Sequence, residues 1–463
     1  MREDLIFYYT DKYTHENLPK IVTEPPGPRA REILSRDNEY IMQSFVRWYP
    51  LVAKRAYGVA VEDVDGNTYI DYNSGLAVMN VGHSHPLVVD KVRKQVEKLI
   101  HYSLTDFYYE EAVRYSEMIL TKVPLPGKGR VFFTNSGTES IEGSIKITRG
   151  CHKGSRPYII AFYGAFHGRT TGSMALSASK PIHRKGFQPL MSGVIHVPYP
   201  YPYRCPFATE PEGCGDAVIG FMEDWVFSKL VDPTEVAAVF IEPIQGEGGY
   251  VVPPNDFFPK LRKLTEKHGI LLVVDEVQSG FGRTGKWFAI EHWGVKPDLI
   301  ATAKAIASGL PLGAIFGRDD VMTLPGGSHA NTFGGNPVAL AAAEAVYEIL
   351  SAGAIENAAR VGESIMRRVK EWVNKYEIVG DVRGKGLMIG VELVESKESK
   401  KPLKKRIGDI LNRSFKRGVA LIGAGVSTIR IAPPLVITEE IAHKALDIVE
   451  EIIADVDKEV RGG

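Results

Sequence analysis

Two apolar runs of the chain end in residues that are able to do chemistry. Asp275 and Glu276 follow the run 271–274, and Lys304 follows the run 299–301. A carboxylate at the end of a buried strand is costly unless it is paired, so we expect Asp275 to face a metal, a basic side chain or a protonated ring nitrogen. A lysine in apolar surroundings can act as a nucleophile or form a Schiff base, although a surface lysine on a loop is the alternative for Lys304.

A third apolar run, 131–133, leads through the polar turn Ser136-Gly137-Thr138 into a helix. The first turn of a helix presents unpaired N–H groups and partial positive charge, so this turn can hold a phosphate. A plain helix cap, with Glu139 in the first turn, is the alternative interpretation.

These three segments together match the needs of one cofactor. Pyridoxal phosphate requires a lysine for its aldehyde, an acid for its pyridine nitrogen and a site for its phosphate. Lys304, Asp275 and the turn 136–138 supply all three, and Phe166 is available to stack on the ring. Because no cluster of His, Cys and Asp has the spacing of a metal site, we predict pyridoxal phosphate and no metal.

Strands and helices alternate between residues 131 and 335. The apolar, partly β-branched runs are 131–133, 158–162, 236–241, 270–274 and 299–301. Such runs, alternating with helical patterns, predict an α/β fold with a mainly parallel sheet between helices. Ligands of such sheets bind beyond the carboxyl ends of the strands, which is where the three segments described above lie.

The chain divides into three parts on this interpretation. Residues 1–80 form an N-terminal arm and part of a small domain, 81–340 a large cofactor-binding domain, and 341–463 the rest of a smaller α+β domain. A helix begins at Asn336 and Pro337, with Asn as its cap. The last helix has one apolar stripe, formed by Ile441, Ala445, Val449, Ile452 and Val456.

Composition excludes several classes of protein. The 463 residues contain 56 Lys+Arg and 56 Asp+Glu, so the basic excess of a nucleic-acid binder is absent. The most apolar stretches, such as 236–241 and 270–274, are strand-sized and too short to span a bilayer. The N-terminus does not resemble a signal peptide, so we expect a cytoplasmic protein without a membrane partner. Of the 3 cysteines, Cys205 and Cys214 could pair or share a metal, but we expect free thiols in a loop.

From about residue 47 to residue 437 the chain resembles the class III (ornithine/4-aminobutyrate-type) pyridoxal-phosphate aminotransferases of fold type I. The motifs that carry the resemblance are Gly82-His83-Ser84-His85-Pro86, Asn135-Ser136-Gly137-Thr138-Glu139, Phe166-His167-Gly168-Arg169-Thr170, Glu242-Pro243-Ile244-Gln245-Gly246-Glu247-Gly248, Asp275-Glu276-Val277-Gln278 through Gly285, Lys304 with Gly309-Leu310-Pro311-Leu312-Gly313-Ala314, Thr332-Phe333-Gly334-Gly335-Asn336-Pro337, and Arg430 before Ala432-Pro433-Pro434-Leu435. They occur in the order that the family has them.

The resemblance implies roles around the cofactor. Lys304 would form the Schiff base and then move the proton, and Asp275 would keep the pyridine nitrogen protonated. Gln278 would bond the phenolic oxygen, with Val277 and Phe166 on the two ring faces. Further cofactor contacts are implied for Ser136, Gly137, Thr138, His167, Glu242 and, from a neighbouring subunit, Thr332. The active site would therefore require a homodimer or a higher homo-oligomer.

The resemblance also implies four substrate-binding positions. Arg169 would bind a substrate carboxylate, and Glu247 would pair with Arg430 as a switch between an ω-amino donor and the α-carboxylate of 2-oxoglutarate. Leu76 stands where ornithine-specific relatives carry a tyrosine, which argues against strict ornithine recognition.

Two reactions are compatible with these residues. Transfer of an amino group from a 4-aminobutyrate- or ornithine-like donor to a 2-oxo acid, 2-oxoglutarate above all, is our main hypothesis. The alternative is amino-acid racemisation or epimerisation, in which Glu247 would be a second acid that protonates the opposite face. A binding module that has kept only the fold is a third class, but such a relative should have lost Lys304 or Asp275.

Overall fold

A computed structural model describes residues 2–7 and 13–462 of the chain. The described residues form two compact units. The large unit contains Leu87–Gly282 and Lys286–Glu348. The small unit contains the described residues up to Pro86, the short segment Arg283–Gly285, and the chain from Ile349 onward.

The large unit is built on a seven-stranded sheet with the order β4-β10-β9-β8-β7-β5-β6. Its strands are β4 (Gly129–Thr134), β5 (Tyr158–Phe162), β6 (Val194–Val197), β7 (Val236–Ile241), β8 (Leu271–Asp275), β9 (Leu299–Thr302) and β10 (Gly313–Arg318). Neighbouring strands from β6 through β9 run parallel, and β10 runs antiparallel to both β9 and β4. The expected α/β fold with a mainly parallel sheet is confirmed, whereas β6 and the antiparallel β10 were not predicted.

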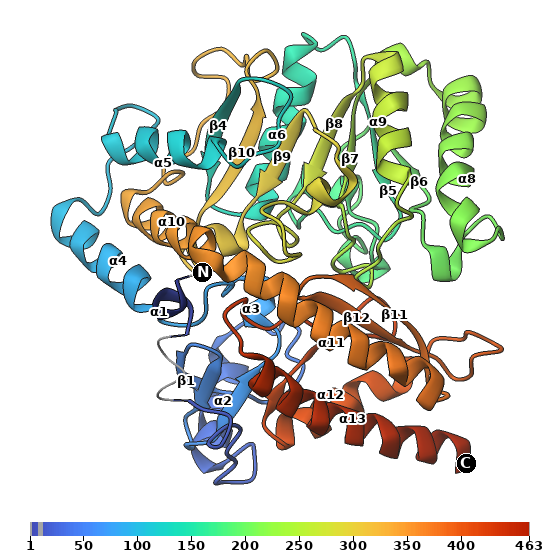
Figure 1. The fold of residues 1–463 in the computed structure, drawn as a ribbon. Helices are drawn as coiled ribbons and strands as arrows, with labels where there is room; N and C mark the ends of the chain where they lie inside the picture. The colour runs from blue at the N-terminus through green and yellow to red at the C-terminus, as the bar shows by residue number, and fades with distance from the viewer. Residues whose placement is uncertain (1, 8–12, 463) are drawn as a thin grey trace. The chain divides into compact units, whose positions relative to one another are not determined.

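Several helices of the large unit pack against this sheet through buried apolar residues. The helices are α4 (Pro86–Lys98), α5 (Glu110–Leu120), α6 (Gly137–Cys151), α7 (Thr171–Leu176), α8 (Cys214–Phe221), α9 (Phe257–His268) and α10 (Pro337–Ile349), with a π-helical segment η4 (Met222–Leu230) and short 3-10 turns η1 (Pro181–His183), η2 (Pro202–Arg204), η3 (Pro211–Gly213), η5 (Pro233–Glu235), η6 (Ala289–Trp293) and η7 (Lys304–Ala307). Helix α6 lies along β9 and β10, and α9 lies along β8 (Figure 1). Ile141 and Ile145 of α6 join Phe240 and Val273 of the sheet in one buried cluster, which holds the strand ends in place.

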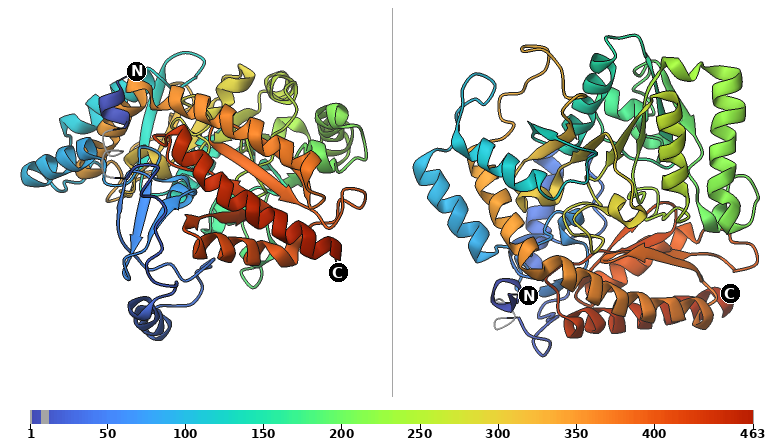
Figure 2. Two further views of the ribbon diagram at one scale, coloured as in Figure 1. Left: turned by 60° about the horizontal axis from the view of Figure 1, so that its bottom comes forward. Right: turned by 45° about the horizontal axis from the view of Figure 1, so that its top comes forward.

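The small unit has two four-stranded sheets. One contains β1 (Ala53–Tyr57), β2 (Ala60–Asp63), β3 (Thr68–Asp71) and β13 (Val419–Ala420), and the other contains β11 (Val379–Lys385), β12 (Met388–Leu393), β15 (Thr428–Ile431) and β14 (Ile422–Ala424). Its helices are α1 (Glu3–Ile6), α2 (Pro28–Tyr40), α3 (Ser74–Ala77), η8 (Leu350–Ala354), α11 (Ile355–Lys375), η9 (Lys404–Arg406), α12 (Ile407–Lys416) and α13 (Glu439–Gly462). Because β13 pairs parallel with β3, the two ends of the chain share a sheet. Figure 2 shows α11, α12 and α13 side by side.

Two helix predictions are confirmed. The Oδ1 atom of Asn336 accepts the N–H of Val338 at 2.9 Å, so Asn336 caps the helix that Pro337 begins. The predicted apolar stripe of α13 is buried, from Ile441 through Val456.

Arg283 has a structural role that its motif did not reveal. The side chain is fully buried in the small unit. Its guanidinium donates to the carbonyl oxygens of Leu387 at 3.0 Å and Pro433 at 2.6 Å, and also to Ser74 and Asn80. A buried guanidinium needs such acceptors, so Arg283 joins three distant segments of this unit.

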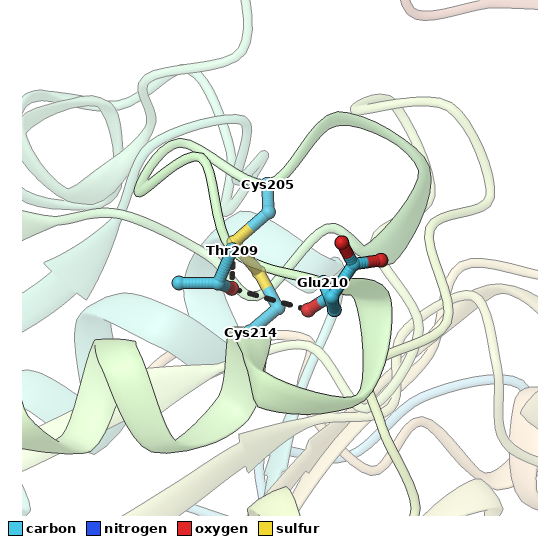
Figure 3. The surroundings of a disulfide bond; sticks show 4 residues. All are labelled: Cys205, Thr209, Glu210 and Cys214. Atoms are coloured by element: carbon cyan, nitrogen blue, oxygen red, sulfur yellow. Dashed lines mark hydrogen bonds between the residues drawn. A yellow bond between two sulfur atoms is a disulfide. The ribbon is translucent and has the colours of Figure 1, made fainter.

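The expectation of free thiols at Cys205 and Cys214 is wrong. The two cysteines form a disulfide, with their Cα atoms 5.8 Å apart (Figure 3). Between them the chain turns at 205–208, where the N–H of Ala208 donates to the carbonyl oxygen of Cys205 at 3.3 Å, and again in η3, so residues nine apart in sequence reach bonding distance. Thr209 lies beside the bridge, with its Oγ1 atom 3.5 Å from the sulfur of Cys205.

One helical stretch, residues 337–375, is long and apolar enough to cross a membrane by length and composition. The expectation that the most apolar stretches are strand-sized is therefore wrong for this one, which begins with the predicted helix α10 and continues through α11. Of its most apolar window, 72% is buried within the protein.

Candidate active site

Lys304 begins the turn directly after β9 and is half-buried. Its backbone has a φ of +50°, in the left-handed region that residues with a Cβ rarely adopt. Such a conformation costs of order 1–3 kcal/mol and concentrates at functional sites. The structure therefore places Lys304 at the carboxyl end of a central strand, in a conformation that the surrounding fold imposes.

Asp275 ends β8, the strand next to β9, and is 5% exposed. Its Oδ2 atom lies 2.8 Å from Nδ1 of His167, and its Oδ1 atom accepts the N–H of Val277 at 3.0 Å. Burial lowers the pKa of His167, but the hydrogen bond and charge of Asp275, together with Glu242, outweigh it and raise that pKa. Of the partners expected for Asp275, the structure shows a basic side chain, that of His167.

Glu242 is a second buried acid beside this pair. It follows β7 and accepts the N–H of Phe166 at 3.1 Å and that of Gly246 at 3.0 Å. Burial raises the pKa of Glu242, with a further increase from the charge of Asp275 and a decrease from His167. Glu242 thus fixes the backbone of Phe166.

The turn 136–138 begins α6, as predicted. Ser136 caps the helix by accepting the N–H of Glu139 at 3.3 Å, so its expected position at the helix N-terminus is confirmed. The Oγ1 atom of Thr138 lies 2.7 Å from Oγ1 of Thr170 and 2.6 Å from Oγ of Ser173. This cluster of hydroxyls beside a helix N-terminus can donate to a phosphate. The predicted phosphate site at 136–138 therefore stays a prediction.

Three features test whether pyridoxal phosphate fits these residues. A Cβ atom on Gly137 would come 2.8 Å from Val277, and one on Gly246 would collide with Oε1 of Gln278, so both glycines permit close approach. Within residues 2–7 and 13–462, the buried Oε1 of Gln278 has no hydrogen-bond partner. A buried acceptor of this kind is costly, and a hydroxyl on a bound ring would satisfy it. The residues fit the cofactor.

Two side chains contact Phe166, and an ion pair lies close enough to one of them, His183, to shift its pKa; we call Phe166, Arg169, His183, Lys180 and Glu247 the Phe166 cluster. The guanidinium of Arg169 lies 5.3 Å from the centre of the Phe166 ring, and the ring of His183 meets it edge-on at 5.4 Å. Lys180 forms an ion pair with Glu247, its Nζ atom 2.6 Å from Oε1. The sequence interpretation missed Lys180, because a separation of 67 residues from Glu247 leaves no spacing signal.

Leu76 and Arg430 belong to the small unit. Leu76 lies in a turn where four successive residues, 74–77, have positive φ, and is 45% exposed. Asn73 stabilises this turn by accepting the N–H of Leu76 at 3.1 Å. Arg430 lies in β15 and is 2% exposed. The substrate roles of both residues, and the pairing of Arg430 with Glu247, stay predictions.

Thr332 is exposed, in the turn that precedes α10 of the large unit. Its neighbour Asn331 anchors this turn by donating from Nδ2 to the carbonyl oxygen of Phe133 at 2.9 Å. An exposed threonine on an anchored turn is suited to reach another subunit, and that role also stays a prediction.

Glu276, the residue after Asp275, is a structural acid. It is fully buried, accepts the N–H of Ile290 at 2.8 Å, and receives the hydroxyl of Ser279. Burial raises the pKa of Glu276 to about 7, against partial lowering by these hydrogen bonds. Glu276 therefore joins the loop after β8 to η6 and does not face the cofactor residues described above.

This pKa predicts a pH dependence of stability. Because the folded state holds the proton of Glu276 more tightly than the unfolded state does, the free energy of unfolding should fall as pH rises from about 4.5 to about 7. In Glu276→Gln we expect this fall to be smaller by about 1–3 kcal/mol, measured by denaturant unfolding at several pH values. The exposed Glu235→Gln is the control, and parallel curves for wild type and Glu276→Gln would contradict the assignment.

Comparison with known proteins identifies the family. The family model for class-III aminotransferases matches residues 41–453. An alanine/serine racemase of Pyrococcus horikoshii is 44% identical over 445 residues, covering 94% of this chain and 93% of that protein. A 4-aminobutyrate aminotransferase of Mycobacterium leprae is 39% identical over 444 residues, covering 95% and 99%.

A solved structure agrees with the sequence relatives. The PLP-bound amine transaminase from an uncultivated Pseudomonas species superposes with a TM-score of 0.83 at 29% identity, covering 90% of this chain and 98% of that one. The fold type, the cofactor and the family predicted from the motifs are therefore confirmed. The chain belongs to the class-III aminotransferase family and is a pyridoxal-phosphate enzyme.

Proposed function

We propose that the protein transfers an amino group from an ω-amino compound or an amino acid, 4-aminobutyrate- or ornithine-like, to a 2-oxo acid, with 2-oxoglutarate as the main acceptor. The observation that carries this proposal is the arrangement of Lys304 and the Asp275–His167 pair at the ends of neighbouring strands. The cations of the Phe166 cluster, Arg169 and Lys180, support a substrate that bears carboxylates.

Each residue has a defined part in this chemistry. When bound, pyridoxal phosphate supplies an aldehyde for the amine and a ring that accepts electrons. Lys304 would hold the aldehyde at its Nζ atom and then move a proton from the substrate carbon. Asp275, oriented by His167 at 2.8 Å, would hold a proton at the ring nitrogen. Ser136, Gly137 and Thr138 would hold the phosphate, and Phe166, Val277 and Gln278 would position the ring.

Racemisation is the second candidate, favoured by the 44% identity to the Pyrococcus horikoshii alanine/serine racemase. It would use the same lysine and require a proton donor on the opposite face, for which Glu247 is our candidate. The ion pair of Glu247 with Lys180 at 2.6 Å supports a binding charge instead.

One assay separates the two reactions. The cofactor-loaded enzyme is incubated with single L-amino acids and with 4-aminobutyrate, with and without 2-oxoglutarate, and both glutamate and D-amino acid are measured. We expect glutamate formation that depends on the oxo acid. Rapid appearance of the D-enantiomer with negligible glutamate would refute transfer as the main activity.

We also propose that the active enzyme is a homodimer in which Thr332 reaches the phosphate of the other subunit. A groove of about 750 Å³ in the large unit is lined from α5, from β4 and from the segment 326–334 beside Thr332. Large apolar side chains near this groove are exposed, among them Val113 at 57% and Phe333 at 61%. Such surface is typical of an interface, and the sedimentation mass of the cofactor-loaded protein tests it.

A further inference from the structure

Lys180 is placed to control the charge of the Phe166 cluster. The side chains of Lys180 and Glu247 are 31% and 24% exposed, so their ion pair is shielded from water in part. Partial shielding leaves more of a charge's effect on its neighbours than full exposure does. The pair therefore contributes to the charge balance at His183, whose ring contacts Phe166.

The formal charges of the Phe166 cluster sum to one net positive charge. Arg169 and Lys180 are cations and Glu247 is a carboxylate. Burial lowers the pKa of His183, and the charges of Arg169 and Lys180 lower it further while Glu247 raises it, so His183 adds no charge at neutral pH. The neighbouring Arg184 is directed elsewhere, since it donates to the carbonyl oxygen of Ser177 at 3.2 Å.

The link between the ion pair and Phe166 runs through His183. The charges of Arg169, Lys180 and Glu247 shift the pKa of His183. The ring of His183 contacts Phe166, and its Nδ1 atom lies 3.0 Å from Oγ of Ser179. The backbone of Phe166 is in turn held by Glu242. A change of charge at Lys180 therefore alters the electrostatic environment of His183, next to Phe166, the side chain that the resemblance places against the cofactor ring.

We propose that Lys180 is a specificity-determining residue: by offsetting the charge of Glu247, it leaves the Phe166 cluster positive and favours substrates with two carboxylates over substrates with one. This inference rests on the proposed function, because it assigns the substrate class of that same site. The physical basis is that one additional fixed charge at short range contributes more to a doubly charged ligand than to a singly charged one.

Ligand binding to the cofactor-loaded protein tests this without turnover. Glutarate, with two carboxylates, and butyrate, with one, are titrated by calorimetry. We expect Lys180→Met to raise the dissociation constant of glutarate roughly three- to tenfold and that of butyrate less than about twofold. Lys180→Arg should restore binding, and the effect should shrink at high salt. Lys185→Met, an exposed lysine of the same loop, is the control.

Glu247→Gln separates a charge effect from structural damage. Removing the negative charge raises the net charge of the cluster, so glutarate should bind more tightly than to the wild type, opposite in sign to Lys180→Met. A structural role for the ion pair would weaken binding in both variants. Weakening in both, equal changes for glutarate and butyrate, or no preference of the wild type for glutarate would each overturn the proposal.

Kinetics then distinguish this inference from the proposed function. In Lys180→Met, KM for 2-oxoglutarate should rise more than KM for pyruvate, with little change in kcat. If the wild type transfers no amino group to either acid but the glutarate pattern holds, the proposed function fails and the specificity assignment stands. If transfer occurs and both KM values are unchanged, the assignment of Lys180 is wrong.

Discussion

Replacement of Lys304 by alanine should reduce turnover by about 10⁴-fold, because it removes both the amine that holds the cofactor and the group that moves the proton. The visible absorbance of the lysine-linked cofactor should disappear, and dialysis should release the cofactor. The exposed Lys296→Ala, eight residues earlier, is the control and should keep both activity and colour. An unchanged absorbance band in Lys304→Ala would refute the assignment of the lysine.

The backbone at this position provides a check that does not depend on activity. The φ of Lys304 is +50°, which glycine adopts more easily than alanine does. We therefore expect cofactor-free Lys304→Gly to be more stable than Lys304→Ala by up to about 1 kcal/mol, measured by denaturant unfolding. This comparison separates loss of chemistry from loss of folding.

Asp275→Asn should lower kcat by roughly 10²–10³-fold while the protein stays folded. Asparagine keeps the shape of the side chain and can still bond His167, but it removes the negative charge that would hold a proton at the ring nitrogen. NMR of nitrogen-labelled cofactor should show the ring nitrogen protonated in the wild type and unprotonated in the variant. The exposed Asp224→Asn is the control.

If the ring nitrogen of the cofactor stayed protonated in Asp275→Asn, the role assigned to Asp275 would be contradicted, even if activity were low. Low activity alone has a second cause, since the variant also alters a buried pair with an Oδ2–Nδ1 distance of 2.8 Å. Loss of a charge from such a pair destabilises a protein. The unfolding free energy of the cofactor-free variant measures that contribution separately.

The large sheet shows which strands a pattern can predict. The strands 158–162 and 236–241 were predicted to the residue, because each is an uninterrupted apolar run that is buried in the sheet. Strand β10 was missed because Gly313 and Gly317 interrupt its pattern. Both glycines are needed for packing, since a Cβ on Gly317 would come 2.7 Å from the sulfur of Met322 and one on Gly313 would collide with Thr134.

The disulfide is a feature that the sequence analysis predicted wrongly for a different reason. By spacing alone the two cysteines, nine residues apart, could pair or share a metal, and free thiols in a loop were predicted instead. Only the turns between the two cysteines, at 205–208 and in η3, decide among these, because bonding depends on the distance and direction of the Cβ atoms.

The sequence by itself determined where the predicted cofactor residues lie, because Lys304, Asp275 and the turn 136–138 each follow an apolar strand and strand ends share one edge of a parallel sheet. Tertiary structure alone decided their partners: His167 beside Asp275, and Lys180 beside Glu247. Those contacts join segments 108 and 67 residues apart. Neither separation leaves a periodic signal, since it is the packing of side chains between strands, and not local spacing, that brings such residues together.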